Sequence, residues 1–157
     1  MIARGSTSRS KTEFSDELNM MGATYKGHSD REFTSFGVQA SKHDVGKAVE
    51  LLGDAICNPS INSAELELLK EEVSMEHEAN HTRFEETTME NAHFNSFREH
   101  MIGQPIKGDR DMTQELGVDH VREYHTAGYY GDNITVVATG DVNHQAVVDA
   151  VSHAFAT

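Results

Sequence analysis

Apolar side chains recur at helical spacing over much of this chain. In the first such stretch, Phe14, Leu18 and Met21 lie at i, i+4 and i+7. Gly22 follows directly and is typical of the residue that ends a helix. The pattern predicts a helix from Ser10 to Met21.

An alternating pattern comes next. In EFTSFGVQA, the apolar residues Phe36, Val38 and Ala40 are separated by Gly37 and Gln39, as expected for a half-buried strand. The preceding ATYKGHS is joined to it by the short polar connection SDR. The two stretches therefore predict a β-hairpin.

Helical patterns account for most of the remaining chain. We expect a helix that is capped by SKHD, continues through Ile56 and ends at Asn58-Pro59. The next helix is expected from Asn62 or Ser63 through His81. Further helices are expected over Thr87–Met101, over Asp119–Ala127 and in DVNHQAVVDAVSHAF. GQPIKGDRD is expected to be a loop, and the apolar run NITVVATG a strand. This order of elements predicts an α+β fold.

Composition and charge limit the classes of function that are compatible with this chain. The 157 residues suit one domain, and the formal net charge of −13 argues against nucleic acid as a partner. No apolar run approaches the length of a membrane span. The single cysteine, Cys57, follows an apolar run, which favours a buried structural thiol over a nucleophile.

The stretch EHEANH contains a literal H-E-x-x-H motif, formed by His77, Glu78 and His81. In zinc proteases this motif places two histidines one helical turn apart on the metal, with the glutamate as general base. A third ligand at the expected spacing is missing from the following HTRFEETT. A solvated, His-rich helix end is therefore the favoured interpretation of the motif, with a zinc site as the alternative.

The apolar face of the same helix, when continued, reaches the residues at the start of this motif. Leu66, Leu69 and Val73 lie at i, i+3 and i+7, and continuing this face leads to Glu76 or His77. A core helix would normally carry another apolar residue there. The break in the apolar pattern at that point therefore needs an explanation.

Taken in order, these segments resemble the pitrilysin/insulinase-type metallopeptidases. Residues 1–80, from MIARGSTSRSK to EHEAN, are similar to the branch that includes mitochondrial processing peptidase β subunits and the core proteins of respiratory complex III. The tail from VDHVREYH to VSHAF is similar as well. The resemblance implies a mixed β-sheet packed against helices.

The resemblance also implies a zinc site of the inverted form H-x-x-E-H, completed by a glutamate on a later helix. Glu76 falls at the position of that glutamate. The chain contains no H-x-x-E-H, and SFREH has Ser96 where the first histidine should be. We therefore expect no catalytic residue and no cofactor in this chain itself, and zinc at Glu76 only if an upstream segment supplies the histidines.

Two positions depart from the pattern implied by the resemblance. Leu69 stands where relatives often carry a second, supporting glutamate, and Lys26 stands where they carry asparagine. The basic start MIARGSTSRSK, which superficially reads as a mitochondrial transit peptide, instead matches an internal loop of the family. We thus expect residues 1–157 to form one peptidase-like domain without its N-terminal strands and zinc-motif helix, and therefore to be unstable alone.

These implications lead to a primary and an alternative function. The primary expectation is a non-proteolytic core subunit of a mitochondrial complex, specifically respiratory complex III, with a homologous α-type or core subunit and other membrane-complex subunits as partners. The alternative is a portion of an active zinc-dependent processing peptidase subunit that cleaves presequence peptides. Both place the protein in mitochondria, in the matrix or on the matrix side of the inner membrane.

Overall fold

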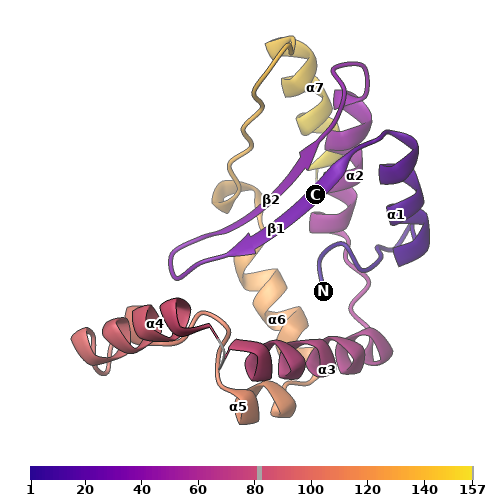
Figure 1. Ribbon diagram of the computed structural model, residues 1–157. Helices are drawn as coiled ribbons and strands as arrows, with labels where there is room; N and C mark the ends of the chain where they lie inside the picture. Colours follow the sequence, from indigo (N-terminus) through magenta and orange to yellow (C-terminus); the bar gives the residue numbers. More distant parts are fainter. Residues whose placement is uncertain (81–82, 157) are drawn as a thin grey trace. The chain divides into compact units, whose positions relative to one another are not determined.

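Helices dominate the described residues, where they are accompanied by a two-stranded sheet (Figure 1). The computed structural model describes residues 1–80 and 83–156. The elements are α1 (Lys11–Met20), β1 (Thr24–Ser29), β2 (Thr34–Gln39), α2 (Val45–Cys57), α3 (Ser63–Asn80), α4 (Phe84–Ser96), η1 (Met101–Gly103), α5 (Arg110–Glu115), α6 (Val118–Gly128), η2 (Gly131–Asn133) and α7 (His144–Ala154). The predicted α+β class is confirmed.

The described residues group into two compact units. The first unit contains residues 1–27, residues 36–61 and the chain from Asp119 onward, and the second contains residues 28–35 and 62–118. The base of the β1–β2 hairpin thus belongs to the first unit and its tip to the second. Within the described ranges, no helix is both long enough and apolar enough to span a membrane. The expectation of a single peptidase-like domain stays a prediction.

Helix α1 forms where the sequence predicts it, between two clear end signals. At its start, the Ser10 hydroxyl accepts a hydrogen bond from the Glu13 amide, while the Glu13 carboxylate accepts one from the Ser10 amide. At its end, Gly22 adopts a φ of 58°, in the left-handed region that favours glycine. The helix buries Phe14 and Leu18, which pack with Leu51 and Ala55 of α2 in the core of the first unit.

The hairpin is also confirmed. The Asp30 amide donates to the Phe33 carbonyl oxygen over 2.8 Å and closes the turn between the strands. Phe36 and Val38 are half-buried, as the alternating pattern predicts. The ring of Tyr25 meets that of Phe14 edge to face at 5.7 Å, and this contact joins β1 to α1.

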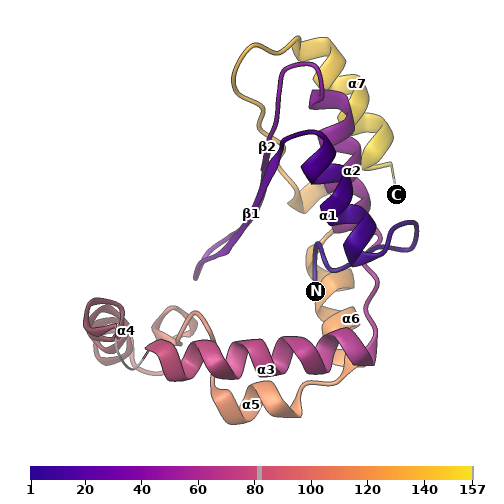
Figure 2. The same cartoon turned by 45° about the vertical axis from the view of Figure 1, so that its right-hand side comes forward.

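Helix α2 is the central helix of the first unit. It buries Leu51, Ala55 and Ile56, and each large side chain removed from water stabilises the fold by about 1.5–3 kcal/mol. Helices α2 and α7 lie side by side in both views (Figures 1 and 2). The predicted closing helix is confirmed as α7, and Asn143 caps it by accepting a hydrogen bond from the Ala146 amide over 3.0 Å.

The prediction of one helix over Thr87–Met101 is partly wrong. Helix α4 begins earlier, at Phe84, and ends at Ser96. Glu99 has a φ of 65°, which interrupts helical geometry, so Met101 lies in the separate turn η1. The apolar residues Met89, Phe97 and Met101 of this stretch are exposed, and α4 contains no buried residue.

Two further predictions differ from the structure. NITVVATG is not a strand, because no neighbouring strand within the described chain pairs with it, and strands are stabilised by such pairing. Val136 and Val137 are consequently 42% and 77% exposed. The expected loop GQPIKGDRD contains the start of a short helix, α5, because Asp109 caps it by accepting hydrogen bonds from the Asp111 and Met112 amides.

Candidate functional site

Helix α3 carries the residues that the sequence singles out for metal chemistry. Its inward face is formed by buried Leu66 and Lys70, followed by partly buried Val73 and His77. Glu76 is exposed. Of the two residues to which the apolar pattern leads, the structure therefore selects His77, because successive helical residues diverge by about 100°.

The Glu76 carboxylate has an ionic partner. Its Oε2 atom lies 3.4 Å from the Nζ atom of Lys107, and the two side chains are 61% and 36% exposed. Both groups are thus in contact with solvent, and screening makes such pairs weak contributors to stability. The candidate metal ligand is nevertheless not an isolated carboxylate.

Lys107 reaches Glu76 because the chain after η1 turns back along α3. The Gly108 amide donates to the Pro105 carbonyl oxygen over 3.0 Å, and Gly108 adopts a φ of 72°. Helix α5 follows at once and packs against α3, where the Lys70 ammonium donates to the Gln114 carbonyl oxygen over 3.1 Å. This turn and helix fix the backbone that carries Lys107.

A second ion pair connects the same two segments. The Nη2 atom of Arg110 lies 3.4 Å from Oε1 of Glu78. Glu78 is the residue that an H-E-x-x-H site would use as general base, and here it is two-thirds exposed and paired with a guanidinium. Sequence reasoning did not identify Lys107 or Arg110 as partners of this helix.

His77 of the apparent H-E-x-x-H motif is partly buried. Its Nε2 atom is shielded from solvent and makes no hydrogen bond within the described part of the protein. The other histidine of the motif, His81, lies outside the described residues. Across residues 1–80 and 83–156, no three His, Cys, Asp or Glu side chains are grouped as a metal site.

A cluster of ionic groups in the first unit was not predicted either. The Arg9 guanidinium contacts Glu17 at 2.9 Å and Glu50 at 2.9 Å, and its Nη1 atom contacts Asp54 at 2.8 Å. The hydroxyls of Ser6 and Ser8 also donate to Asp54. Arg9 therefore joins the N-terminal loop and α1 to α2.

The same contacts govern the acidity of Asp54. Burial acts to raise the pKa of its carboxyl group, but hydrogen bonds from Ser6, Ser8 and Arg9 outweigh burial and lower that pKa. Hydrogen bonding to Glu17, with smaller contributions from Asp54 and Glu50, raises the pKa of Arg9 above its ordinary value. A groove of about 830 Å³ lies beside this cluster, and acidic side chains outnumber the single guanidinium along its wall.

Cys57 at the end of α2 is half-buried. Burial, with a smaller contribution from the negative charge of Asp54, raises the pKa of its thiol. A raised pKa keeps the sulfur protonated at neutral pH, and the thiolate is the nucleophilic form. This agrees with the interpretation of Cys57 as a structural thiol.

Comparison with known proteins identifies relatives of this chain. The chain is 27% identical over 146 residues to human "Cytochrome b-c1 complex subunit 1, mitochondrial", covering 93% of the chain and 30% of that protein. It is 26% identical over 155 residues to human "Mitochondrial-processing peptidase subunit beta", covering 99% of the chain and 32% of that protein. The chain thus spans about a third of the length of these relatives.

A solved structure shares the fold. The crystal structure of a protease from Helicobacter pylori matches with a TM-score of 0.85 and 19% identity, over 98% of this chain and 37% of that one. The family described as "Insulinase (Peptidase family M16)" matches residues 1–110, which include Glu76 and most of both units. The chain belongs to the insulinase family of peptidases.

Proposed function

We propose that this chain is part of a non-proteolytic core subunit of a mitochondrial complex, specifically respiratory complex III. One observation carries the proposal: large apolar side chains of the second unit are exposed. They include Met75, Phe84, Met89, Phe97 and Met101, and Phe84 and Met101 are more than 80% exposed. Exposed apolar surface of this kind is characteristic of a surface that another polypeptide covers.

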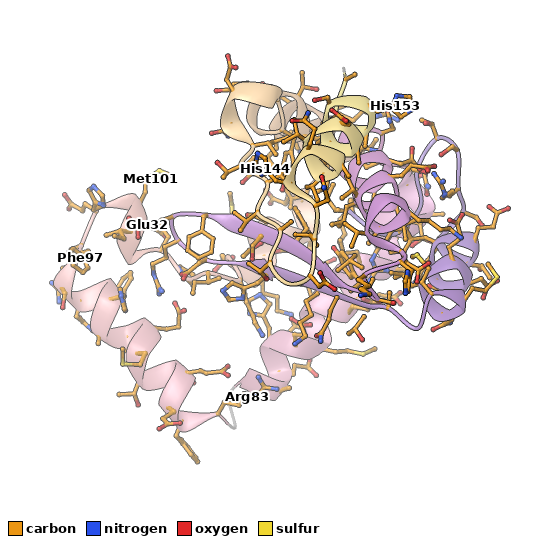
Figure 3. All side chains as sticks on the ribbon, turned by 90° about the horizontal axis from the view of Figure 1, so that it is seen from above. Glu32, Arg83, Phe97, Met101, His144 and His153 are labelled. Atoms are coloured by element: carbon orange, nitrogen blue, oxygen red, sulfur yellow. The ribbon has the colours of Figure 1, made fainter. Side chains whose placement is uncertain are left out.

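Helix α4 is the clearest case. Arg83 precedes it, Phe97 and Met101 follow it, and its side chains extend outward around the helix (Figure 3). Met89 lies about 140° around the helix axis from both Phe84 and Phe94, and all three side chains are more than half exposed. Apolar residues on several sides of one helix indicate burial within an assembly.

The human b-c1 complex relative supports the identity of that assembly. The names of this relative and of the human processing-peptidase relative both describe subunits of mitochondrial proteins. These names support mitochondrial localisation and membership of a multisubunit complex. A homologous core or α-type subunit and further membrane-complex subunits are the proposed partners. The net charge of −13 is compatible with positively charged neighbours.

The non-proteolytic part of the proposal rests on the residues around Glu76. The Glu76 carboxylate fits one oxygen ligand of a zinc ion. The described residues do not complete such a site, because no three metal-ligating side chains are gathered among them. Leu69 and Lys26 also replace the polar groups that the resemblance places near the site. No catalytic step is therefore assigned to this chain.

The test uses the natural polypeptide in mitochondria. We expect it to co-migrate with complex III in native gels, and we expect Phe84→Asp with Met89→Asp to reduce co-migration at least fivefold. Asn91→Asp is the matched control, because it adds charge to exposed α4 without removing apolar surface. A natural polypeptide that migrates alone, or a control as damaging as the double variant, contradicts the proposal.

A second candidate is supported by the similarity to human processing peptidase subunit beta over 99% of the chain. In this case the chain is a portion of an active subunit, an upstream segment supplies the two histidines, and Glu76 completes the zinc shell. The substrates are basic presequences, which suit an acidic protein, and an α-type subunit is required as partner.

Cleavage assays separate the candidates. The active candidate predicts one zinc per natural polypeptide and presequence cleavage that Glu76→Gln abolishes. The H-E-x-x-H hypothesis predicts the opposite sensitivity, with activity lost in His77→Ala and retained in Glu76→Gln. The core-subunit proposal predicts no cleavage before any substitution, and cleavage sensitive to Glu76→Gln overturns it.

A further inference from the structure

The residue at the family's ligand position is held in an ion pair. Glu76 Oε2 lies 3.4 Å from Lys107 Nζ, so an ammonium supplies positive charge where a bound metal ion would otherwise supply it. We propose that Lys107 is the counter-ion of Glu76 in this protein and that it lowers the affinity of Glu76 for divalent metal ions. The inference concerns this chain's own residues and holds for either candidate function.

The backbone keeps Lys107 in place. Lys107 is the third residue of the hydrogen-bonded turn from Pro105 to Gly108, and the left-handed Gly108 redirects the chain into α5. Helix α5 is anchored to α3 by the hydrogen bond from buried Lys70 to the Gln114 carbonyl oxygen. The turn that carries Lys107 is therefore held beside Glu76, because α5, which follows the turn, is hydrogen-bonded to α3.

The effect of Lys107 on a metal ion is electrostatic. The pair adds little to stability, because both side chains are partly exposed. A divalent ion bound by Glu76, however, would be repelled by the ammonium, because the Glu76 oxygen and the Lys107 nitrogen lie only 3.4 Å apart. In a solvent-like dielectric with salt screening, this repulsion weakens metal binding by roughly three- to tenfold.

Arg110 provides a matched control. Its guanidinium lies 3.4 Å from Glu78, the same separation as in the Lys107 pair, and on the same helix. Glu78 follows Glu76 by two positions, so its side chain points about 200° away around the helix axis. Removing the Arg110 charge should therefore affect a metal ion at Glu76 much less than removing the Lys107 charge.

The first measurement tests the ion pair without metal. In the natural polypeptide with isotope-labelled lysine, the side-chain ζ resonance of Lys107 is followed by NMR. We expect Glu76→Gln to shift this resonance and Glu78→Gln to leave it in place. Equal shifts in the two variants, or no shift in either, would show that Lys107 does not pair with Glu76 and would overturn the proposal.

The second measurement tests metal affinity, with zinc ions alone as the probe and a coloured chelator as competitor. Lys107→Met is expected to bind zinc three- to tenfold more tightly than the unmodified protein, and the gain is expected to disappear when Glu76→Gln is added. Arg110→Met is expected to change affinity by less than twofold. Equal effects of Lys107→Met and Arg110→Met, or no zinc binding by Lys107→Met, overturn the affinity claim. Neither measurement depends on complex membership or presequence cleavage, so this proposal and the proposed function fail separately.

Discussion

Gly53 in α2 and Ala154 in α7 lie so close that a β-carbon added to Gly53 would be 2.7 Å from the Ala154 carbonyl oxygen. The obstructing atom belongs to backbone and cannot rotate away. We expect Gly53→Ala to separate the helices and destabilise the first unit by about 1–3 kcal/mol. Urea unfolding of the natural polypeptide, monitored by amide exchange in α2, measures the loss.

Gly46 is the control for that substitution, because it lies in the same helix and an added β-carbon meets nothing within 4 Å. Alanine has the higher helix propensity, so Gly46→Ala should be neutral or stabilise by up to about 1 kcal/mol. If both alanine substitutions stabilised the protein, the close approach of α2 and α7 would be disproved.

Removing the Arg9 guanidinium should destabilise the junction of α1 and α2. Arg9→Leu leaves Glu17, Glu50 and Asp54 without their shared cation. Since the Arg9 side chain is only 20% exposed, we expect a loss of about 1–3 kcal/mol in the free energy of unfolding. Thermal or urea unfolding of the natural polypeptide provides the measurement.

The control for Arg9 is Lys42, whose ion pair with Asp141 in the same unit is more than half exposed on both sides. Lys42→Met should change stability by less than about 0.5 kcal/mol. Similar losses for the two substitutions would indicate that the Arg9 cluster is no more important than an ordinary surface pair.

The contribution of Asp54 should depend on pH. Its folded-state pKa lies below the ordinary value of 3.8, so its stabilisation is fully present above that value and is lost as pH falls through the folded pKa. The stability difference between the unmodified protein and Asp54→Asn should therefore be constant near neutral pH and shrink from about pH 4 downward. A difference that grows on acidification would contradict this assignment.

The isolated 157-residue chain should not unfold cooperatively as a monomer. Its buried apolar core within the described residues consists of few side chains, whereas Phe84, Met101 and Val137 are largely exposed. We expect the isolated chain to bind the dye ANS and to self-associate, because exposed apolar surface promotes both. A single cooperative transition at a concentration-independent temperature, without dye binding, would contradict this expectation.

Short-range sequence patterns were sufficient to predict α1, α7 and the hairpin. Helix α1 has its cap, its apolar face and its terminal glycine within thirteen residues, and α7 has Asn143 at its start. The hairpin followed from the alternation around Phe36 and Val38. Each of these elements is determined by neighbours in the sequence, so no knowledge of distant contacts was needed.

The failures have non-local causes. The valines of NITVVATG have strand-forming character, but a strand requires a pairing partner, which local sequence does not reveal. Glu76 could be singled out through the family resemblance, yet its partner Lys107 comes from a loop beyond α4. The helical period alone left Glu76 and His77 unresolved, because adjacent positions at the edge of a face differ by only one step of rotation.

The serine- and arginine-rich start of the chain, which superficially resembles a leader, consists largely of side chains engaged by the folded protein. Ser6, Ser8 and Arg9 all bind Asp54, and Ser10 caps α1. Removing these ten residues would therefore uncap α1 and take away the cation that Glu17, Glu50 and Asp54 share. A composition typical of removable targeting sequences here supplies side chains that link α1 to α2, and a form of the protein prepared without them should have a less stable first unit.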